Sequence, residues 1–401
     1  MKIVNVVGTR PNMMKIAPIM WEMKREQSAI RPVLVHTGQH YDAALNDIFL
    51  SQLRIGVPDY HLGVGLGSPC SQIGQIITRL EEVLVKEKPD LVLVVGDVNS
   101  TIAAALTSVK AGVPVAHVEA GLRSFDRTMP EELNRLATDA ISDLLFVTEP
   151  SGIENLRREG VDTFVMDGAP VGDVSPAVRE SIARICNGSG PRRCGVFVGN
   201  VMIDTLLAMK EHAEEDAHVT VPDGDYALLT LHRPANVDDP EAFRQIISAL
   251  SLIAEGLPIL FPCHPRTLSR IGEFGMGGFF KQAAEDSPAH LARSINLVKP
   301  LGYLEFLKLM SRAAMVLTDS GGIQEETTIL GVPCFTLRDN TERPITLEMG
   351  TNILTGTSHD AIVNTISAAL AGPPKTGARP PLWDGKAAER IVKILELARF
   401  S

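Results

Sequence analysis

The stretch Met315-Val-Leu-Thr-Asp-Ser-Gly-Gly-Ile-Gln-Glu-Glu326 decides how the second half of the chain folds. Its apolar start, Met315 to Leu317, predicts a strand, and the residues 319–322 predict a tight turn. A helix is expected from Ile323 to Leu330, where a glycine and then a proline end it. Glycines let a backbone approach a ligand closely, and free N–H groups at a helix start favour anions, phosphate above all. The stretch therefore predicts an anion site at a strand–helix turn.

Composition limits the partners that the chain can have. At 401 residues it is too long for one typical core, so two domains are expected. A net charge of −10 argues against nucleic acid or an anionic membrane as a bulk partner. No apolar run approaches the length of a membrane span, and the first strand meets a turn too early for a signal peptide. The five scattered cysteines, with no Cys-x-x-Cys, favour reduced thiols in a cytoplasmic protein over disulfides or zinc.

Short β-branched runs alternate with helical patterns in both halves of the chain, which predicts parallel α/β sheets. The stretch of about Asp167–Gly195 interrupts this alternation, with one weak helical segment at Pro176–Ile185. The strands expected in the first half are Lys2–Val7, Pro32–His36, Leu91–Val95, Val115–Val118 and Leu144–Val147, with helices at Ser71–Lys86 and Ser100–Lys110. Those expected in the second half are Tyr226–Leu231, Pro258–Pro262, Ile295–Val298, Met315–Thr318 and Val332–Phe335, with a last helix at Lys386–Arg399.

Unusual polar residues follow several of these strands. In doubly wound sheets, ligands sit beyond the carboxyl ends of the strands, so these residues are the candidates for a site in a cleft between the two domains. They are Gly8-Thr-Arg-Pro11 with Lys15, Gly96-Asp97, Glu119 to Arg123, His232-Arg233, His264, and the Ser-Gly-Gly turn.

Each candidate also has an ordinary structural interpretation. The Gly8 turn with Lys15 either binds a diphosphate or is a solvated turn. Asp97 is either a catalytic carboxylate or the N-cap of the following helix. Glu119, at the end of a buried strand, needs a partner, and Arg123 is the candidate for a functional or a structural ion pair.

The same choice applies to the remaining polar segments. Pro130-Glu-Glu-Leu-Asn-Arg135 is typical of a helix start, and beside Asp97 and Glu119 a second role for Glu131 becomes plausible. His232 and His264 suggest acid–base or phosphate work, although a histidine at a strand end is more often structural. The arginines of the loop Arg338–Arg343 either close on a substrate or are simply solvated.

Several familiar motifs are absent from the sequence. There is no Gly-x-Gly-x-x-Gly between a strand and a helix, no Walker A loop, no His-Glu-x-x-His and no Gly-x-Ser-x-Gly. We therefore expect chemistry that needs no redox cofactor and no metal.

The ordered motifs closely resemble the non-hydrolysing UDP-N-acetylglucosamine 2-epimerases, and the resemblance runs from the first strand to beyond Pro344. The motifs are Gly8-Thr-Arg-Pro11 with Lys15, Thr37-Gly-Gln-His-Tyr-Asp42, Gly96-Asp97, His117-Val-Glu-Ala-Gly-Leu-Arg123, Pro130–Arg135, Gly199-Asn-Val-Met-Ile-Asp204, Thr230-Leu-His-Arg233, Asp319–Glu326 and Thr341-Glu-Arg-Pro344.

The resemblance implies a GT-B-like α/β fold, in which two Rossmann-like doubly wound parallel-sheet domains flank a deep cleft. The expected domains are residues 1–198, with an insertion around 167–195, and a UDP-binding domain at 199–380. Residues 381–401 are expected to form a helix that packs back toward the N-terminal domain. A cytoplasmic homodimer that binds a UDP-sugar, without a cofactor, is implied as well.

The resemblance also assigns residues to roles. Its catalytic positions fall on Asp97, Glu119, Glu131 and His232. Its substrate-binding positions fall on Arg10, Phe306, Ser320, Gly321, Gly322, Glu326 and Arg343, with Lys15, Arg135 and His264 as further expected contacts.

The implied reaction is the reversible interconversion of UDP-GlcNAc and UDP-ManNAc. The C2 proton of the sugar has no neighbouring carbonyl, so breaking the C1–O bond first, with loss of UDP, is the accessible route to a glycal. That route needs a cradle for the departing diphosphate and carboxylates that move protons at C2. The alternatives are a 2-epimerase acting on UDP-2,3-diacetamido-2,3-dideoxy-glucuronic acid, the hydrolysing branch of the family, and a GT-B glycosyltransferase.

Overall fold

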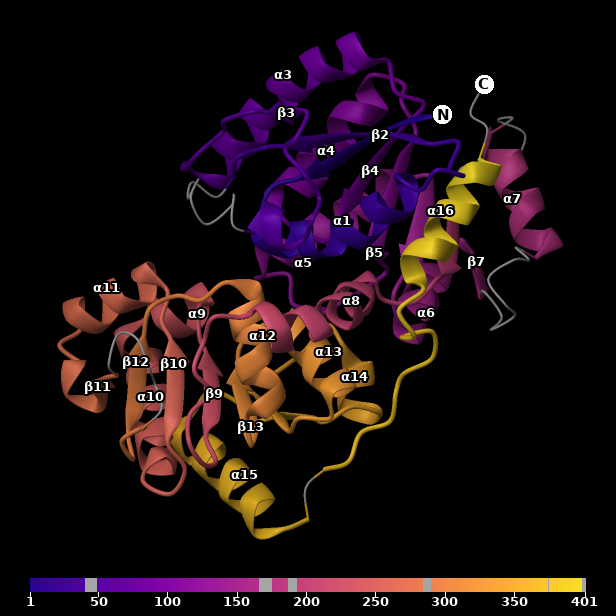
Figure 1. Ribbon diagram of the computed structural model, residues 1–401. Helices are drawn as coiled ribbons and strands as arrows, with labels where there is room; N and C mark the ends of the chain where they lie inside the picture. Colours follow the sequence, from indigo (N-terminus) through magenta and orange to yellow (C-terminus); the bar gives the residue numbers. More distant parts are fainter. Residues whose placement is uncertain (40–48, 166–174, 187–192, 284–289, 374, 399–401) are drawn as a thin grey trace. The chain divides into compact units, whose positions relative to one another are not determined.

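The structure is a computed structural model of the chain, and it describes all residues except 40–48, 166–174, 187–192, 284–289, 374 and 399–401 (Figure 1). The chain forms two compact units. Unit 1 consists of Met1–Leu207 together with Pro381–Ser401, and unit 2 consists of Ala208–Pro380.

Unit 1 is built on an eight-stranded sheet whose described strand pairs are all parallel. The continuous apolar run Leu-Val-Leu-Val-Val of the central strand is buried throughout, as expected where helices cover both faces of a sheet. In spatial order the strands are β3 (Tyr60–His61), β2 (Arg31–His36), β1 (Lys2–Val7), β4 (Leu91–Val95), β5 (Val115–Ala120), β6 (Leu144–Val147), β8 (Cys194–Phe197) and β7 (Asp162–Val165).

Several helices of unit 1 begin at a proline or after a capping side chain. Ser68 caps α3 through its hydroxyl. Pro130 begins α5, and the two acidic residues in its first turn interact favourably with the helix dipole. The last helix, α16, lies beside α1 (Figure 1). The bounds are α1 (Arg10–Met23), α3 (Pro69–Glu87), α4 (Asn99–Lys110), α5 (Pro130–Ile141), α6 (Pro150–Arg158), α7 (Pro176–Cys186), α8 (Val201–Asp216), which continues into unit 2, and α16 (Ala387–Leu397).

Unit 2 is built on a seven-stranded parallel sheet with its own core, centred on buried side chains such as Phe243, Phe261 and Leu317. Its strands, in spatial order, are β11 (Phe280–Gln282), β12 (Ile295–Val298), β10 (Ile259–Pro262), β9 (Ala227–Thr230), β13 (Met315–Thr318), β14 (Cys334–Thr336) and β15 (Asn352–Leu354). Its helices are α9 (Pro234–Val237), α10 (Pro240–Ala254), α11 (Pro265–Glu273), α12 (Tyr303–Arg312), α13 (Gly321–Leu330), α14 (Pro344–Glu348) and α15 (His359–Ala371), with a short 3-10 turn, η1 (Gly277–Phe279).

Most of the elements expected from the sequence are present, and the differences have local causes. The expected strand Val332–Phe335 lies two residues later, at Cys334–Thr336. The short strands β3, β7, β11 and β15 carry too few residues for a hydrophobic period to identify them. The stretch Asp167–Gly195 contains the expected helix as α7, and its last two residues begin β8, which pairs with β6 and β7. The rest of that stretch falls largely on residues 166–174 and 187–192, outside the described residues.

The strand order places a topological switch point in each unit. In unit 1 the order reverses between β1 and β4, so the turns that begin at Gly8 and Gly96 leave the sheet side by side. In unit 2 it reverses between β9 and β13, which brings the segment after Thr230 next to the segment after Thr318. Crevices beyond such points are the usual ligand positions of open α/β sheets. The Gly8 and Gly96 turns lie at the first point, and His232 and the Ser-Gly-Gly turn lie at the second, whereas Glu119 ends the neighbouring strand β5 and His264 follows β10.

Candidate active site

Gly96 forms a turn in unit 1 that favours glycine. Its φ of +68° lies in the left-handed region, where a side chain is strained. A Cβ at this position would stand 2.9 Å from Lys15 Nζ, 3.3 Å from Asn12 Nδ2 and 3.3 Å from Glu119 Oε2. The glycine therefore allows three polar side chains, two from α1 and one from β5, to converge at the end of β4.

Glu119 is held in a strained conformation at the end of β5. Its φ is +75°, and the pairing of β5 with β6 shifts register between Val118 and Ala120. Such backbone costs about 1–3 kcal/mol and concentrates at functional sites. The Glu119 carboxylate accepts a hydrogen bond from Lys15 Nζ, and both side chains are less than a tenth exposed. The prediction that Glu119 pairs with Arg123 is therefore wrong.

Arg123 instead belongs to a buried chain of charges behind the turn. Its NH1 lies 2.7 Å from Asp139 Oδ2, and it also forms an ion pair with Glu159. Asp139 accepts a hydrogen bond from the Gly121 amide as well and lies 2.7 Å from His117 Nδ1. Burial would raise the pKa of Asp139, but His117 and Arg123 outweigh it and lower that pKa. A carboxylate therefore anchors the loop that follows β5.

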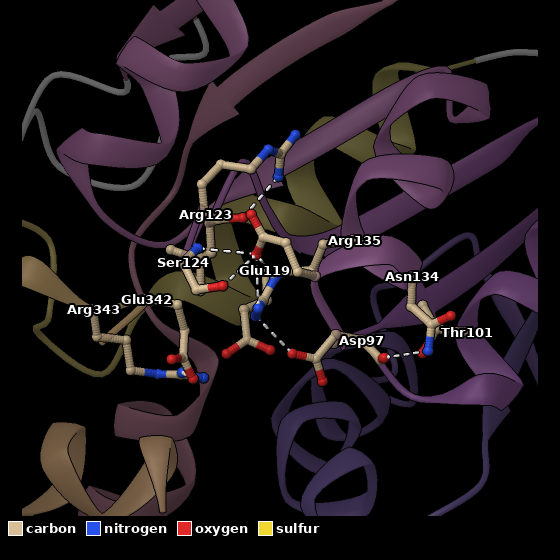
Figure 2. A network of polar contacts seen from close by, with 12 residues as sticks. Asp97, Thr101, Glu119, Arg123, Ser124, Asn134, Arg135, Glu342 and Arg343 are labelled. Atoms are coloured by element: carbon tan, nitrogen blue, oxygen red, sulfur yellow. Dashed lines mark hydrogen bonds and ion pairs between the residues drawn. The ribbon is translucent and has the colours of Figure 1, made fainter. Parts of the chain in front are cut away.

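Asp97 presents a carboxylate at the end of β4 and does not cap α4. The N-cap of α4 is Val98, which makes no side-chain capping bond, so the capping interpretation of Asp97 is wrong. Its Oδ2 lies 2.9 Å from Arg135 NH1, and its main-chain carbonyl accepts a hydrogen bond from Asn134 Nδ2 (Figure 2). Its side chain remains 22% exposed, whereas that of Arg135 is 2% exposed. A buried cation thus orients an accessible carboxylate.

The two acids at the start of α5 have different environments. Glu132 is buried, forms an ion pair with Arg135, and accepts hydrogen bonds from the main-chain amides of Ser124 and Phe125. It fixes the loop before the helix and so has a structural task. Glu131, one position earlier, is half-buried. Lys15, Gly96, Asp97, Glu119 and Arg135 are called the unit 1 cluster below.

In unit 2, His232 follows β9 and lies against a buried acid that follows β13. Asp319 Oδ1 is 3.1 Å from His232 Nδ1, and the carboxylate accepts hydrogen bonds from the main-chain amides of His232 and Arg233. Burial would raise the pKa of Asp319, but the His232 ring and these hydrogen bonds lower it. The His232 side chain is 55% exposed. Its ring therefore reaches solvent while Asp319 holds its backbone amide and Nδ1 in place.

The Ser-Gly-Gly turn forms the start of α13, as the sequence predicts. Ser320 occupies the N-cap position without a side-chain capping bond, and Gly331 ends the helix with a φ of +74°. A Cβ on Gly321 would overlap the guanidinium of Arg343 and lie 2.8 Å from Glu342 Oε1. The first turn of α13 therefore presents main-chain N–H groups directly beside an arginine. His232, Asp319, Ser320, Gly321 and Arg343 are called the unit 2 cluster below.

Three arginines surround a single carboxylate near this turn. Glu342 forms ion pairs with Arg338 and Arg343 and lies 3.7 Å from Arg233. Arg343 also pairs with the buried Glu325 at 2.8 Å. Burial lowers the pKa of Arg338, and the neighbouring guanidinium groups of Arg233 and Arg343 add to this effect. The cluster holds guanidinium groups in place beside a helix N-terminus, an arrangement suited to a phosphate.

Glu326 lies on the first two turns of α13 in a buried position. Its Oε1 accepts a hydrogen bond from Tyr303 of α12 at 2.9 Å. Burial raises the pKa of Glu326 to about 8, despite this bond, and the neighbouring Glu325 adds to the rise.

The other predicted substrate contacts lie outside the two clusters. Arg10 opens α1, and its guanidinium lies over the Phe49 ring, 5.4 Å from the centroid. Phe306 is half-buried on α12. His264 is exposed and serves as the N-cap of α11, where its Nδ1 accepts a hydrogen bond from the Arg266 amide at 3.3 Å. That is the structural role that the sequence left open for it. Gly322 follows Gly321 in the first turn of α13.

The structure also reveals residues that sequence reasoning missed. They are buried acids and their donors, which support the expected residues from behind: Glu132, Asp139, Tyr303, Asp319 and Glu342. Asp319 had a usable signal, because it ends a strand directly before the Ser-Gly-Gly turn. The remaining four lie inside or beside helices, where the sequence does not distinguish a buried polar side chain from a solvated one.

Within the described parts of the chain, no group of three or more His, Cys, Asp or Glu side chains is arranged to hold a metal ion. A search of the same residues finds no helix with the length and hydrophobicity needed to cross a bilayer.

Comparison with known proteins gives a consistent assignment over the whole chain. The family model described as UDP-N-acetylglucosamine 2-epimerase matches residues 22–396. A Methanocaldococcus jannaschii protein named UDP-N-acetylglucosamine 2-epimerase is 39% identical over 408 residues, which cover 100% of both chains. A crystal structure of the enzyme from that organism, in complex with UDP-GlcNAc and UDP, superposes with a TM-score of 0.82 at 39% identity and covers 98% of this chain and 99% of the other.

A second activity occurs among the similar proteins. A Pseudomonas aeruginosa protein named UDP-2,3-diacetamido-2,3-dideoxy-D-glucuronate 2-epimerase is 38% identical over 371 residues, or 92% of each chain.

Proposed function

Because the chain belongs to the UDP-N-acetylglucosamine 2-epimerase family, we propose that it interconverts UDP-GlcNAc and UDP-ManNAc by inversion at C2. The resemblance stated from the sequence motifs is confirmed, as is the expected α/β fold with a Rossmann-like parallel sheet in each half of the chain. The roles of individual residues below are part of the proposal.

The proposed reaction proceeds by elimination and re-addition. A base removes the proton from C2 while the C1–O bond breaks, which releases the UDP anion and leaves a 2-acetamidoglucal with a C1=C2 double bond. A proton then returns to C2 on the opposite face, and a diphosphate oxygen of UDP adds back to C1. Atoms and charge balance over the cycle, and no redox step occurs.

We assign the proton transfers to Asp97, Glu119 and Glu131 of unit 1. Proton transfer by a positioned carboxylate contributes typically about 10²–10⁴-fold to a rate. The observation that carries this proposal is the Gly96 turn, around which Lys15 and Glu119 converge while Arg135 orients Asp97. The paired cations fix the directions of these carboxylates, as a base at a carbon acid requires.

We assign the retention of the leaving group to unit 2. Ser320, Gly321 and Gly322 offer helix N-terminal N–H groups, and Arg343 adds a guanidinium, so developing negative charge on the diphosphate is stabilised as C1–O breaks. Glu326 is proposed to accept hydrogen bonds from the ribose hydroxyls, and His232 to exchange a proton or donate to the departing oxygen. Arg10, His264 and Phe306 are proposed as further substrate contacts.

The alternative substrate is UDP-2,3-diacetamido-2,3-dideoxy-glucuronic acid, the substrate named for the Pseudomonas aeruginosa relative. Its epimerisation needs the same elimination chemistry. The pocket would also need one more basic side chain to bind the substrate's carboxylate. The identity to that relative, 38%, is almost the same as the 39% to the archaeal one, so the two substrates must be compared directly.

Hydrogen exchange at C2 tests the proposal. The protein is incubated with UDP-GlcNAc in D2O and followed by NMR, with the diacetamido-uronate substrate in a parallel reaction. Deuterium at C2 together with the appearance of UDP-ManNAc is expected. Absence of exchange into UDP-GlcNAc, with exchange into the uronate, would transfer the assignment to the second substrate.

Three further expectations stay predictions: the homodimer, the cytoplasmic location and the domain limits at 198 and 380. Light scattering of the purified protein is the direct measurement of the first.

A further inference from the structure

The exposed ring of His232 lies against the buried acid Asp319. The role proposed for His232 does not by itself account for Asp319. The two residues follow neighbouring parallel strands, β9 and β13, which are paired in register from Met315↔Ala227 to Thr318↔Thr230. Their meeting is therefore fixed by the sheet and not by a loop. Asp319 is fully buried, whereas the His232 side chain is 55% exposed.

Asp319 has the hydrogen-bond partners of an ionised carboxylate. It accepts from the His232 amide at 3.0 Å, from the Arg233 amide at 2.8 Å and from Asn236 Nδ2 at 3.2 Å. These groups are all donors, and a protonated acid would have to turn its own hydrogen toward one of them. Asn236 also donates to the Leu337 carbonyl, which ties the same side chain to the end of β14.

An ionised Asp319 determines which ring nitrogen of His232 carries the hydrogen. A carboxylate only accepts, so Nδ1, 3.1 Å from Oδ1, must be the N–H donor. In the neutral ring this leaves the lone pair on Nε2, the nitrogen on the far side of the ring from Asp319.

We propose that Asp319 is a positioning residue that holds His232 in the Nδ1–H tautomer, so that Nε2 is the atom that exchanges a proton with the substrate. When Nε2 takes a proton, the ring becomes an imidazolium paired with the Asp319 carboxylate, and Asp319 itself stays ionised. This inference deepens the proposed function, because it rests on the role proposed for His232 there.

The tautomer is measured directly by two-bond ¹H–¹⁵N correlation of the histidine side chains. The spectrum is recorded on the whole protein well above the usual imidazole pKa of about 6.5. The His232 signals are identified by their loss in His232→Gln. The wild type is expected to show the Nδ1–H pattern, and Asp319→Asn is expected to lose it, because an amide N–H can donate to Nδ1 and favour the other tautomer.

Kinetics give the second readout. Asp319→Asn is expected to lower kcat about 10²–10⁴-fold, the range seen when a histidine base is left in the wrong tautomer or is removed, with KM changed much less. The limb of the pH–rate profile that His232 contributes should move to lower pH, since the imidazolium loses its paired carboxylate.

Asp204→Asn is the matched control. Asp204 is also a buried acid, but it lies in unit 1, and its carboxylate accepts from two successive main-chain amides, those of Ala387 and Ala388, and not from a histidine ring. This variant should leave the His232 spectrum and kcat unchanged.

A wild-type Nε2–H pattern at His232 would overturn the proposal, and this result needs no variant to fold. An Asp319→Asn protein that keeps both the Nδ1–H pattern and kcat would also overturn it. Failure of the proposed epimerase activity is a separate result, because the tautomer is read without any substrate.

Discussion

The two clusters at the switch points share a position in their sheets but differ in charge. In the unit 1 cluster every buried cation has an acid: Lys15 pairs with Glu119, and Arg135 with Asp97 and Glu132. Beside the unit 2 cluster, Glu342 is shared among three arginines, one of which is Arg343 of the cluster. Arg343 pairs with Glu325 as well, and the start of α13 adds its dipole. The cations of the first set hold carboxylates in fixed directions, whereas the second set offers an anion the N–H groups and the dipole at the start of α13, with the Arg343 guanidinium beside them.

The difference suggests how one fold divides a single reaction. Removing a proton from carbon needs bases of fixed direction, and retaining a diphosphate needs donors that are already in place. The strain is distributed accordingly: a non-glycine residue with positive φ, Glu119, lies in the unit 1 cluster. In the unit 2 cluster the close approach is made by a glycine, Gly321, whose missing Cβ leaves room for Arg343.

The largest effect is expected from Asp97→Asn, which removes a base and keeps the side-chain shape. Epimerisation should fall about 10³-fold, within the range for loss of a general acid or base. Binding of UDP should stay within about threefold of wild type, a difference of under about 1 kcal/mol. Glu159→Gln is the control, because it removes an acid from Arg123 away from the cluster. Turnover by Asp97→Asn close to the wild-type rate would remove Asp97 from the mechanism.

Gly96→Ala tests whether the turn itself assembles the bases. Its Cβ would displace Lys15 Nζ and Glu119, and activity should fall about 10²-fold, since misplacement by an ångström has that effect. Gly112→Ala provides a matched control, because Gly112 has a similar φ of +73° and nothing within 4 Å of the added atom.

Both glycine variants should lose about 1–2 kcal/mol of stability from the backbone alone. Equal activity losses in the two, measured by initial rates alongside thermal unfolding, would mean that backbone strain and not the cluster is responsible.

Gly321→Ala should weaken UDP binding about tenfold to a hundredfold, because the new methyl group pushes Arg343 away from the start of α13. Gly272→Ala is the control, as a helical glycine with open space around its Cβ. Calorimetric titration with UDP measures both variants. Unchanged affinity in Gly321→Ala would show that the turn does not hold the diphosphate.

Glu326→Gln has the smallest expected effect on activity and a distinct effect on the pH dependence of stability. The pKa of Glu326 is raised from 4.5 to about 8, so the folded protein binds a proton that the unfolded chain releases. The free energy of unfolding therefore falls as pH rises from about 4.5 to about 8, by roughly 1–4 kcal/mol from this group.

Glutamine does not titrate, so the Glu326→Gln protein should show a flatter profile over this range in denaturant titrations. A wild-type profile as flat as that of the variant would show that Glu326 is already ionised in the folded protein.

The sequence predicted the sheets and the strand-end positions because both depend on local patterns. A strand at Leu91–Val95 and a glycine turn after Thr318 can be recognised from the local sequence without tertiary information. The partners could not be predicted this way: Glu119 pairs with Lys15, 104 positions away, and not with Arg123, four positions away. Two features determine the partner of Glu119: its own positive φ, and the ion pair that Arg123 forms with Asp139 instead. Such choices depend on which strands are neighbours, which no short segment encodes.

The central claim, that unit 1 acts on the proton and unit 2 retains the leaving group, is tested most directly by titrating UDP into Asp97→Asn and Gly321→Ala side by side. The account predicts that Asp97→Asn binds UDP within about threefold of wild type and that Gly321→Ala binds at least about tenfold more weakly. The reverse order, with Asp97→Asn losing UDP and Gly321→Ala retaining it, would contradict the account.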